Sequence, residues 1–192
     1  MMSTREKQQK TLYRLVFSAL MAAMVFVSTS FLKVDIVTPV GPTMLKSGNI
    51  VCLLSGLLFG GVPGGLAAGV GSMLFDLLDP RYIADAPWTL IRFGLMGAMC
   101  GWIAHSGGAK GLSFRRNLVA TVSASVFSFV FYVIKSVIDL LLAGSAFAPA
   151  VVAVVPKMVT SGINYIVAIV VALLLAVPLN KALDKAGMLD KI

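Results

Sequence analysis

The sequence predicts an all-α, polytopic integral membrane protein, in which residues 1–192 form one domain built as a bundle of six transmembrane helices. Hydrophobic residues make up 58% of the chain and charged residues only 12%, whereas a soluble domain typically holds about 25% charged residues. The mean hydropathy is +0.94. A chain of 192 residues accommodates roughly six helices of about 20 residues with short loops. No room remains for a soluble catalytic domain.

Apolar runs and the breaks between them define the expected helices. These are residues 12–31, 48–60, 63–78, 88–105, 117–142 and 152–178. The first run follows a basic segment and could be a signal peptide, but it is long for one and lacks a clear small-x-small cleavage site, so we expect a retained helix. The segment "VDIVTPVGPTMLKSGN" is expected to be a long, proline-rich outer loop.

The break between the second and third helices is the segment "FGGVPGG". Pro63 removes a backbone donor and the glycines permit a tight reversal, which favours two short helices over one long helix. Cys52 and Cys100 lie in apolar runs without Cys-x-x-Cys spacing and are expected to be packing residues. His105 is the one histidine and is expected at an interface. No metal site and no cofactor are predicted.

The basic residues divide into two sets along the chain. The larger set precedes the first helix, joins the fourth to the fifth helix and ends the chain: Arg5, Lys7, Lys10, Arg14, Lys110, Arg115, Arg116, Lys181, Lys185 and Lys191. The smaller set comprises Lys33, Lys46, Arg81 and Lys157. Because cytoplasmic loops carry the excess of Lys and Arg, both termini are predicted to be cytoplasmic, which requires an even number of helices. The net charge of +8 then reflects topology, and a nucleic-acid role is not expected without a folded basic domain.

Polar residues interrupt the apolar segments at one depth, in the outer half of the predicted bundle. They are Lys46, Asn49, Asp76, Arg92, Lys135, Asp139, Lys157, Thr160, Ser161 and Asn164. An ionisable side chain in hydrocarbon costs at least about 2.5–3.5 kcal/mol, so it normally faces a partner or a cavity. One interpretation is that Asp76 with Arg92, and Lys135 with Asp139, are ion pairs that only fix the helix register. Lys46 and Lys157 are then left without obvious partners, and a small polar ligand that enters from outside explains them better.

Aromatic residues occur at the same depth: Tyr82, Trp88, Phe131, Tyr132 and Tyr165. An interfacial aromatic belt is an equal alternative for Tyr82 and Trp88, while Tyr132 and Tyr165 are better placed to flank a bound ring. A planar heterocycle with hydroxyl, amine or phosphate substituents fits this set. The predicted ligand contacts are Lys46, Asn49, Trp88, Arg92, Tyr132, Lys135, Asp139, Lys157, Ser161 and Asn164. Asp76 is predicted to be a structural ion-pair residue, and no catalytic residue is identified.

The inner half carries small residues at four-residue spacing. Ala19 and Ala23 form an Ala-x-x-x-Ala pair in the first helix, and Gly61, Gly65 and Gly69 follow the same spacing in the third. Such spacing lets helix backbones approach closely. For the glycines we expect ordinary internal packing.

Three segments resemble the S components of energy-coupling factor (ECF) transporters, which are small six-helix membrane proteins that capture vitamins or their precursors. The segments are "SALMAAMVFVSTSFLKV", "GNIVCLLSGLLFGGVPGGLAAGVGSMLFDLLDP" and "APWTLIRFGLMGAMCGW", and the resemblance covers residues 12–105. The pattern is most similar to the riboflavin-type branch, which includes carriers of hydroxymethylpyrimidine or pyridoxine.

The resemblance implies a multi-pass protein of the bacterial plasma membrane with an outward-facing pocket bounded by the first outer loop and the fourth to sixth helices. It also implies that Ala19 and Ala23 contact a transmembrane T component and that two cytoplasmic ATP-binding subunits supply the energy. The sequence contains no Gly-x-x-x-x-Gly-Lys-Ser/Thr motif, so this chain is not expected to hydrolyse ATP.

Two other functional classes fit the sequence less well. An autonomous secondary transporter often shows an inverted repeat and a polar site at mid-membrane, whereas this chain has no convincing repeat and an off-centre polar level. A membrane-embedded enzyme would require paired catalytic carboxylates or a His and Asp motif, and the chain has one histidine and no such motif. The sequence therefore predicts a binding subunit and not an enzyme.

Overall fold

The structure is a computed structural model that describes residues 4–38 and 41–188. Each of the six segments expected to be helical contains an α-helix. In chain order the elements are α1 (Thr4–Phe31), β1 (Lys33–Thr38), β2 (Gly41–Lys46), α2 (Gly48–Phe59), α3 (Gly61–Leu78), η1 (Ile83–Asp85), α4 (Ala86–His105), η2 (Ser106–Gly108), α5 (Phe114–Leu142) and α6 (Phe147–Lys185). Lys191 and the side chains of Arg5, Lys7 and Lys10, which contribute to the predicted topology, lie outside what is described.

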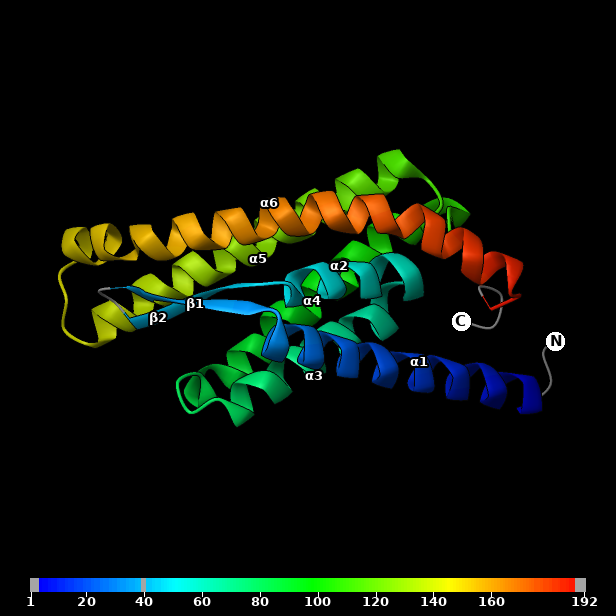
Figure 1. Ribbon diagram of the computed structural model, residues 1–192, viewed down its shortest axis with the longest axis horizontal. Helices are drawn as coiled ribbons and strands as arrows, with labels where there is room; N and C mark the ends of the chain where they lie inside the picture. The colour runs from blue at the N-terminus through cyan, green and yellow to red at the C-terminus, as the bar shows by residue number, and fades with distance from the viewer. Residues whose placement is uncertain (1–3, 39–40, 189–192) are drawn as a thin grey trace.

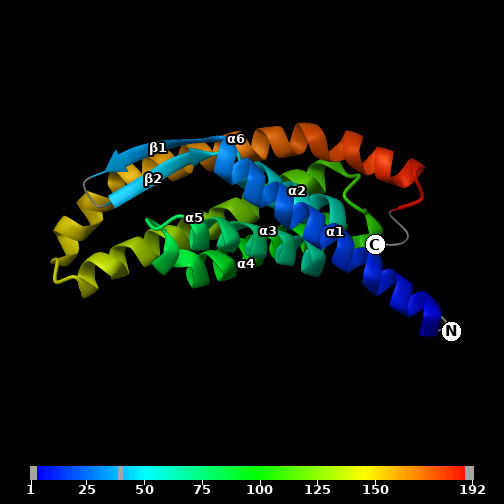
Figure 2. The same cartoon turned by 60° about the horizontal axis from the view of Figure 1, so that its bottom comes forward.

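Helix α2 forms the centre of the bundle. It packs against α1, α3, α4 and α6, and ten of its 12 residues are buried. Figure 1 shows α5 and α6 running along one side of the molecule, with α1 and α3 on the other side, and Figure 2 shows α3, α4 and α5 side by side below α6. The start of α1 and the end of α6 lie at one end, while the β1–β2 hairpin and the α5–α6 connection lie at the opposite end (Figure 1).

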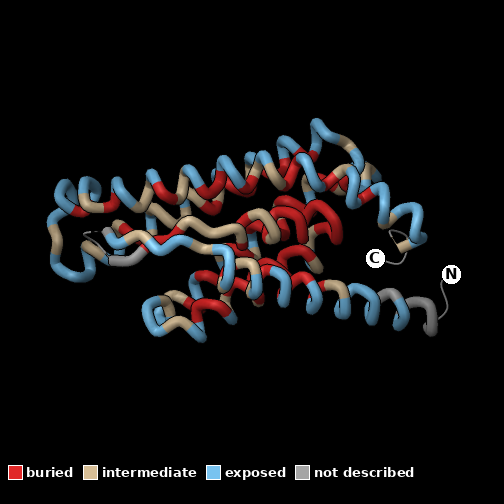
Figure 3. The backbone as a smooth tube through the Cα atoms, viewed as in Figure 1, coloured by how far each residue is buried: buried red, intermediate tan, exposed pale blue. Residues whose placement is uncertain are grey.

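The surface of the bundle is apolar and its interior is rich in alanine. Leu12 is 61% exposed and Phe31 is 79% exposed, whereas Ala124 and Ala168 are completely buried; Figure 3 shows the exposed outer faces of α1, α5 and α6. A soluble protein rarely exposes so much contiguous apolar surface, but lipid tails can cover it. Stretches long and apolar enough to cross a membrane are Thr11–Phe31, Gly61–Leu78, Phe114–Leu142 and Phe147–Lys185.

Two helices extend furthest beyond their predicted ends. α1 begins at Thr4 instead of residue 12 because the polar segment before the apolar run is rich in Arg, Lys, Glu and Gln, which are good helix formers. α6 covers 39 residues, Phe147–Lys185, instead of 152–178. It continues through Pro156 and Pro178, so neither proline ends it. At about 1.5 Å per residue, α6 is roughly 58 Å long and exceeds the ~30 Å hydrocarbon core of a bilayer.

The expected outer loop is a β-hairpin, so the prediction of an all-α fold is wrong at this point. β1 pairs with β2 in antiparallel register, with Lys33 opposite Lys46 and Val37 opposite Pro42. β1 is rich in β-branched residues, which favour strands. Proline normally signals a loop, but each strand of a two-stranded sheet has a free edge, where the missing N–H of Pro42 does no harm.

A charged cluster fastens β1 to the connection between α3 and α4. The Lys33 Nζ lies 3.2 Å from Asp79 Oδ2, and Arg81 donates to both Asp79 carboxylate oxygens at 2.9 and 2.7 Å. Arg81 also donates to Asp35 Oδ2 at 3.1 Å. Hydrogen bonds from Arg81 hold the pKa of the Asp79 carboxyl well below its usual range.

The side chain of Asn164 fastens β2 to α6. Its Oδ1 accepts a hydrogen bond from the Lys46 backbone N–H at 3.0 Å, and its Nδ2 donates to the Met44 carbonyl at 2.7 Å. One amide side chain thus pairs with the β2 backbone as a neighbouring strand would. Because both polar atoms of Asn164 are occupied, this residue holds the hairpin against α6.

A second asparagine of α6 makes a comparable contact at the other end of the bundle. The completely buried Asn180 donates from Nδ2 to the carbonyl oxygens of Leu57 at 3.1 Å and Gly111 at 3.0 Å. Leu57 lies in the last turn of α2, where helix carbonyls lack intrahelical partners. Gly111 has a φ of +69°, a conformation that favours glycine. α6 therefore binds backbone groups with Asn164 near its middle and with Asn180 near its C-terminal end.

Glycines bring α3 and α4 into backbone contact. A Cβ added at Gly65 would lie 2.7 Å from the Gly94 carbonyl oxygen, and one added at Gly101 would overlap the backbone of Gly60. Any side chain at these positions would push the two helices apart. The glycines expected to serve internal packing therefore do so between α3 and α4.

We expect Gly101→Ala to destabilise the protein by about 1–3 kcal/mol, because the added methyl group meets backbone atoms that cannot rotate away. Gly162→Ala is the matched control on α6, since a Cβ at Gly162 meets nothing within 4 Å and alanine favours the helix by up to about 1 kcal/mol. Thermal unfolding of both variants in detergent measures the difference. A Gly101→Ala protein that melts at or above the parent temperature would contradict this packing.

Asp79→Asn should loosen the hairpin, because it removes the carboxylate that Lys33 and Arg81 share. We expect faster hydrogen exchange at the β1 amides, with exchange in α2 unchanged. A carboxyl group whose pKa is lowered in the folded state stabilises that state above its unfolded pKa of about 3.9. The parent should therefore keep its slow β1 exchange at pH 7 and lose it only as the pH falls below about 4. Equal protection in parent and variant at pH 7 would show that the cluster does not hold the hairpin.

Candidate ligand-binding site

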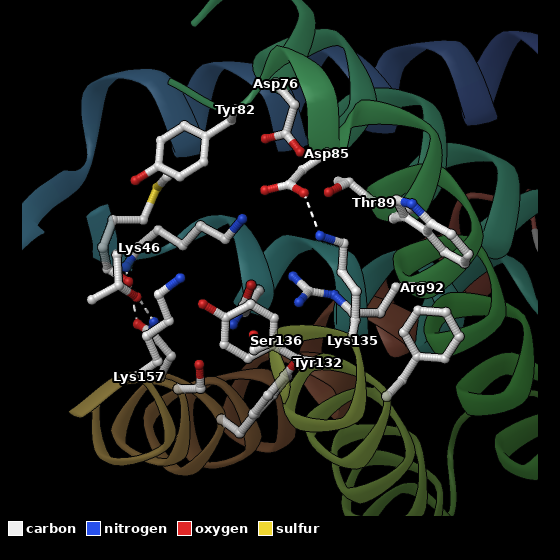
Figure 4. A pocket seen from close by; sticks show the side chains of 18 of the residues that line it. Lys46, Asp76, Tyr82, Asp85, Thr89, Arg92, Tyr132, Lys135, Ser136 and Lys157 are labelled. Atoms are coloured by element: carbon white, nitrogen blue, oxygen red, sulfur yellow. Dashed lines mark hydrogen bonds and ion pairs between the residues drawn. The ribbon is translucent and has the colours of Figure 1, made fainter. Parts of the chain in front are cut away.

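A polar cavity of about 110 Å³ lies toward the hairpin end of the bundle, between β2 and helices α2 to α6. One water molecule needs roughly 10–15 Å³ by this measure, so the cavity has room for a small molecule. All of the predicted ligand contacts line it: Lys46, Asn49, Trp88, Arg92, Tyr132, Lys135, Asp139, Lys157, Ser161 and Asn164. Figure 4 shows side chains from these separate elements directed toward one space. Their contact with a ligand stays a prediction.

Lys135 joins two carboxylates at the wall formed by α5 and the start of α4. Its Nζ lies 2.5 Å from Asp85 Oδ1 and 2.6 Å from Asp139 Oδ2. The ion pair of Lys135 with Asp139, one of the two interpretations of these residues, is thus present, and Asp85 adds a second carboxylate to the same ammonium. The charges that act on Lys157 are also those of Asp85, Lys135 and Asp139. These four residues form one group with no net formal charge.

Arg92 and Lys46 lie against aromatic rings instead of carboxylates. The Arg92 guanidinium carbon is 4.3 Å from the Phe93 ring centroid and 4.8 Å from that of Tyr132, and the Lys46 Nζ is 4.7 Å from the Phe93 centroid. Such contacts stabilise a cation through the ring quadrupole. Burial lowers the pKa of the Lys46 ammonium to about 8, which leaves it mostly protonated at pH 7.

The predicted ion pair between Asp76 and Arg92 is not formed as a direct contact. In residues 4–38 and 41–188, no ion pair within 4.0 Å involves Asp76. The groups that act favourably on its charge are Lys46, Thr89 and Arg92. The physical reason is the direction of Arg92, which turns toward Phe93 and Tyr132. Asp76 is 5% exposed and lines the cavity.

Three polar atoms at the cavity are buried and have no hydrogen-bond partner: Asn49 Oδ1, Tyr82 Oη and Arg92 Nε. A buried polar atom without a partner costs about 1–3 kcal/mol. Tyr82 lies in the turn before α4, and burial raises the pKa of its hydroxyl to about 12. One acceptor, one donor and one hydroxyl at the wall of the cavity are therefore without hydrogen-bond partners.

The aromatic residues at this level have different surroundings. Trp88 is 50% exposed and its ring lies 6.3 Å from that of Phe131, so it forms part of the cavity rim. Tyr165 is buried, and its hydroxyl lies 2.6 Å from the hydroxyl of Ser128. Tyr165 therefore presents its ring to the cavity while its hydroxyl group is already paired.

Five lining residues were not predicted from the sequence: Thr43, Met44, Asp85, Thr89 and Ser136. Thr43 and Met44 lie on the hairpin that was expected to be a loop. Ser136 and Thr89 are single hydroxyls in helices, a signal too common to single out. Asp85 could have been found from its position directly before α4, since an acidic residue there faces the outer ends of the neighbouring helices.

The predicted docking residues lie away from the cavity. Ala19 and Ala23 are exposed on α1, while Ser18 and Ala22 on its other face are buried. Ser18 donates to the Pro63 carbonyl at 3.1 Å, which fixes the inward face of α1 against α3. The alanine pair therefore lies on the outward face of α1.

Comparison with known proteins identifies the family. Residues 9–181 match the family described as "ECF-type riboflavin transporter, S component". A protein of Pyrococcus woesei described as "Uncharacterized protein in gap 3'region" is 34% identical over 110 residues, which cover 57% of this chain and 68% of that protein. The family match covers most of the chain and confirms the resemblance seen in residues 12–105. The chain thus belongs to the riboflavin-type S components, the substrate-binding membrane subunits of ECF transporters, and is not an enzyme.

Proposed function

We propose that the cavity lined by β2 and α2 to α6 is the substrate site, and that it captures a vitamin or vitamin precursor from outside the cell. The single observation that carries this proposal is the convergence of polar side chains from five helices and a hairpin inside an otherwise apolar bundle. Three of their polar atoms have no partner. Ion pairing does not account for Asn49 Oδ1 and Tyr82 Oη, because neither side chain is charged.

We further propose that all six helices lie in the bacterial plasma membrane with both termini in the cytoplasm. The short α2 is shielded by its neighbours, which makes its length compatible with the bilayer. The hairpin, with Lys33 and Lys46, then faces outward. Arg115, Arg116, Lys181 and Lys185 face the cytoplasm, in accordance with the positive-inside rule.

The exposed alanine pair of α1 supports docking on a T component. Ala19 and Ala23 offer a smooth strip on which a second helix can approach closely. A T component with two ATP-binding subunits would supply the energy, since this chain carries no nucleotide-binding motif. Binding and energy supply would then belong to different subunits.

Replacing Asn164 by alanine should weaken substrate binding by roughly 1–3 kcal/mol. The change leaves the Lys46 N–H and the Met44 carbonyl unpaired and releases the strand that carries Lys46. Gly162→Ala, on the same helix but outside the cavity lining, is the control and should bind like the parent. Equilibrium dialysis with a radiolabelled compound that copurifies with the parent measures both. If a folded Asn164→Ala protein binds the compound as tightly as the parent does, this cavity is not the substrate site.

Ala23→Trp should abolish ATP-driven uptake and leave binding in detergent unchanged, because a bulky residue blocks close helix approach. Met24→Trp is the matched control. Met24 is also exposed on α1, but at 100° per residue it points roughly 100–140° away from the alanine pair. Uptake is measured in liposomes that contain the T component and both ATP-binding subunits. Normal uptake by Ala23→Trp, or uptake by the purified chain alone, would contradict the division of labour.

A further inference from the structure

The charges of the cavity are divided unevenly between two groups. Lys135 and Lys157 lie among Asp85 and Asp139, so that group is balanced. The second group, formed by Lys46, Arg92 and Asp76, has two cations and one carboxylate. Its formal charge is therefore +1, and this excess lies at the inner wall formed by β2, α3 and α4.

The two cations of this second group are close together and have no anionic partner in contact. Both lie against the ring of Phe93, so the Lys46 Nζ and the Arg92 guanidinium carbon are at most about 9 Å apart. Among the described residues, neither of them forms an ion pair within 4.0 Å. Both residues also line the cavity, so an acidic group inside it can approach both cations, each over an ion-pair distance of up to about 4 Å.

The unpaired atoms define the remaining contacts of such a molecule. Arg92 Nε is a buried donor without an acceptor, and carboxylates or phosphates are the acceptors that guanidinium geometry favours. Asn49 is 3% exposed and its Oδ1 has no donor. A molecule that satisfies both atoms has an acidic group toward Arg92 and an N–H or O–H toward Asn49.

We propose that the cavity selects a small ring compound that bears one acidic group, either a carboxylate or a phosphate ester, held between Lys46 and Arg92. This substrate class rests on the proposed function of the cavity and differs from riboflavin, which is uncharged. The acidic group neutralises the excess charge of the inner wall, and a donor on the ring pairs with Asn49. Lys135 contributes little to this selection, because Asp85 and Asp139 already neutralise it.

The test uses a small-molecule extract of yeast as the probe. The purified full-length chain is incubated with the extract, unbound compounds are removed by gel filtration, and retained compounds are identified by mass spectrometry. Lys46→Met and Arg92→Gln should retain the parent's compound at least tenfold less. Lys181→Met, an exposed lysine at the far end of α6, is the charge-matched control and should retain it fully. If the retained compound carries a carboxylate, its methyl ester should bind at least tenfold more weakly. If it carries a phosphate ester, the dephosphorylated form should bind at least tenfold more weakly, so the two acidic groups are distinguished.

Each possible result either supports or overturns the proposed substrate class or the proposed function. Retention of an acidic ring compound by the parent, with loss in the two cavity variants, supports the proposal, and the parent's result stands even if a variant does not fold. Retention of a neutral or cationic compound overturns the proposed substrate class and leaves the cavity as a substrate site. Equal retention by folded Lys46→Met and Arg92→Gln proteins also overturns it. Retention of no compound by the parent overturns the proposed function itself.

Discussion

The contact between the backbones of α3 and α4 is the constraint on which the site depends. Glycines on both helices remove the side chains that would separate them, as at Gly65 and Gly101. Because the helices touch, Asp76 near the end of α3 comes within reach of Thr89 near the start of α4. The turn that joins these helices carries Asp79 and therefore also anchors the hairpin. The packing of α3 on α4 thus positions Asp76, the cavity wall that these helices form, and the hairpin beside the cavity.

The sequence was sufficient to predict the helices and the level of the polar residues. Apolar runs, together with the break at Pro63, located the helical segments, and the depth of Arg92, Lys135 and Asn164 followed from the direction of each helix. The depth of a residue along its helix does not determine the direction in which its side chain points around the helix axis. For this reason the cavity lining was predictable, whereas the partner of Asp76 was not, because Arg92 turns toward aromatic rings.

Other features depend on tertiary contacts that a local pattern does not contain. The β-hairpin requires β1 and β2 to pair with each other, which the pattern of neither segment shows by itself. Its position follows from Asn164, a residue 118 positions away from Lys46. Asp85 is isolated in the sequence and gains significance only because Lys135 reaches it from α5. Residues that are unremarkable alone were therefore the ones missed, while ionisable residues in apolar runs were found.

Two asparagines fix the position of α6 along α2. Asn164 forms hydrogen bonds with the backbone of β2, and Asn180 donates hydrogen bonds to the carbonyl groups of Leu57, in the last turn of α2, and Gly111. The two asparagines are 16 residues apart, which corresponds to about 24 Å along a helix. A single residue inserted between them would turn one amide by about 100° and detach it from its backbone partners. The number of residues between Asn164 and Asn180 is therefore constrained, because it sets both the distance and the rotation between the two amides. The outward-facing apolar residues of this stretch are less constrained, since another apolar side chain in the same place leaves these contacts intact.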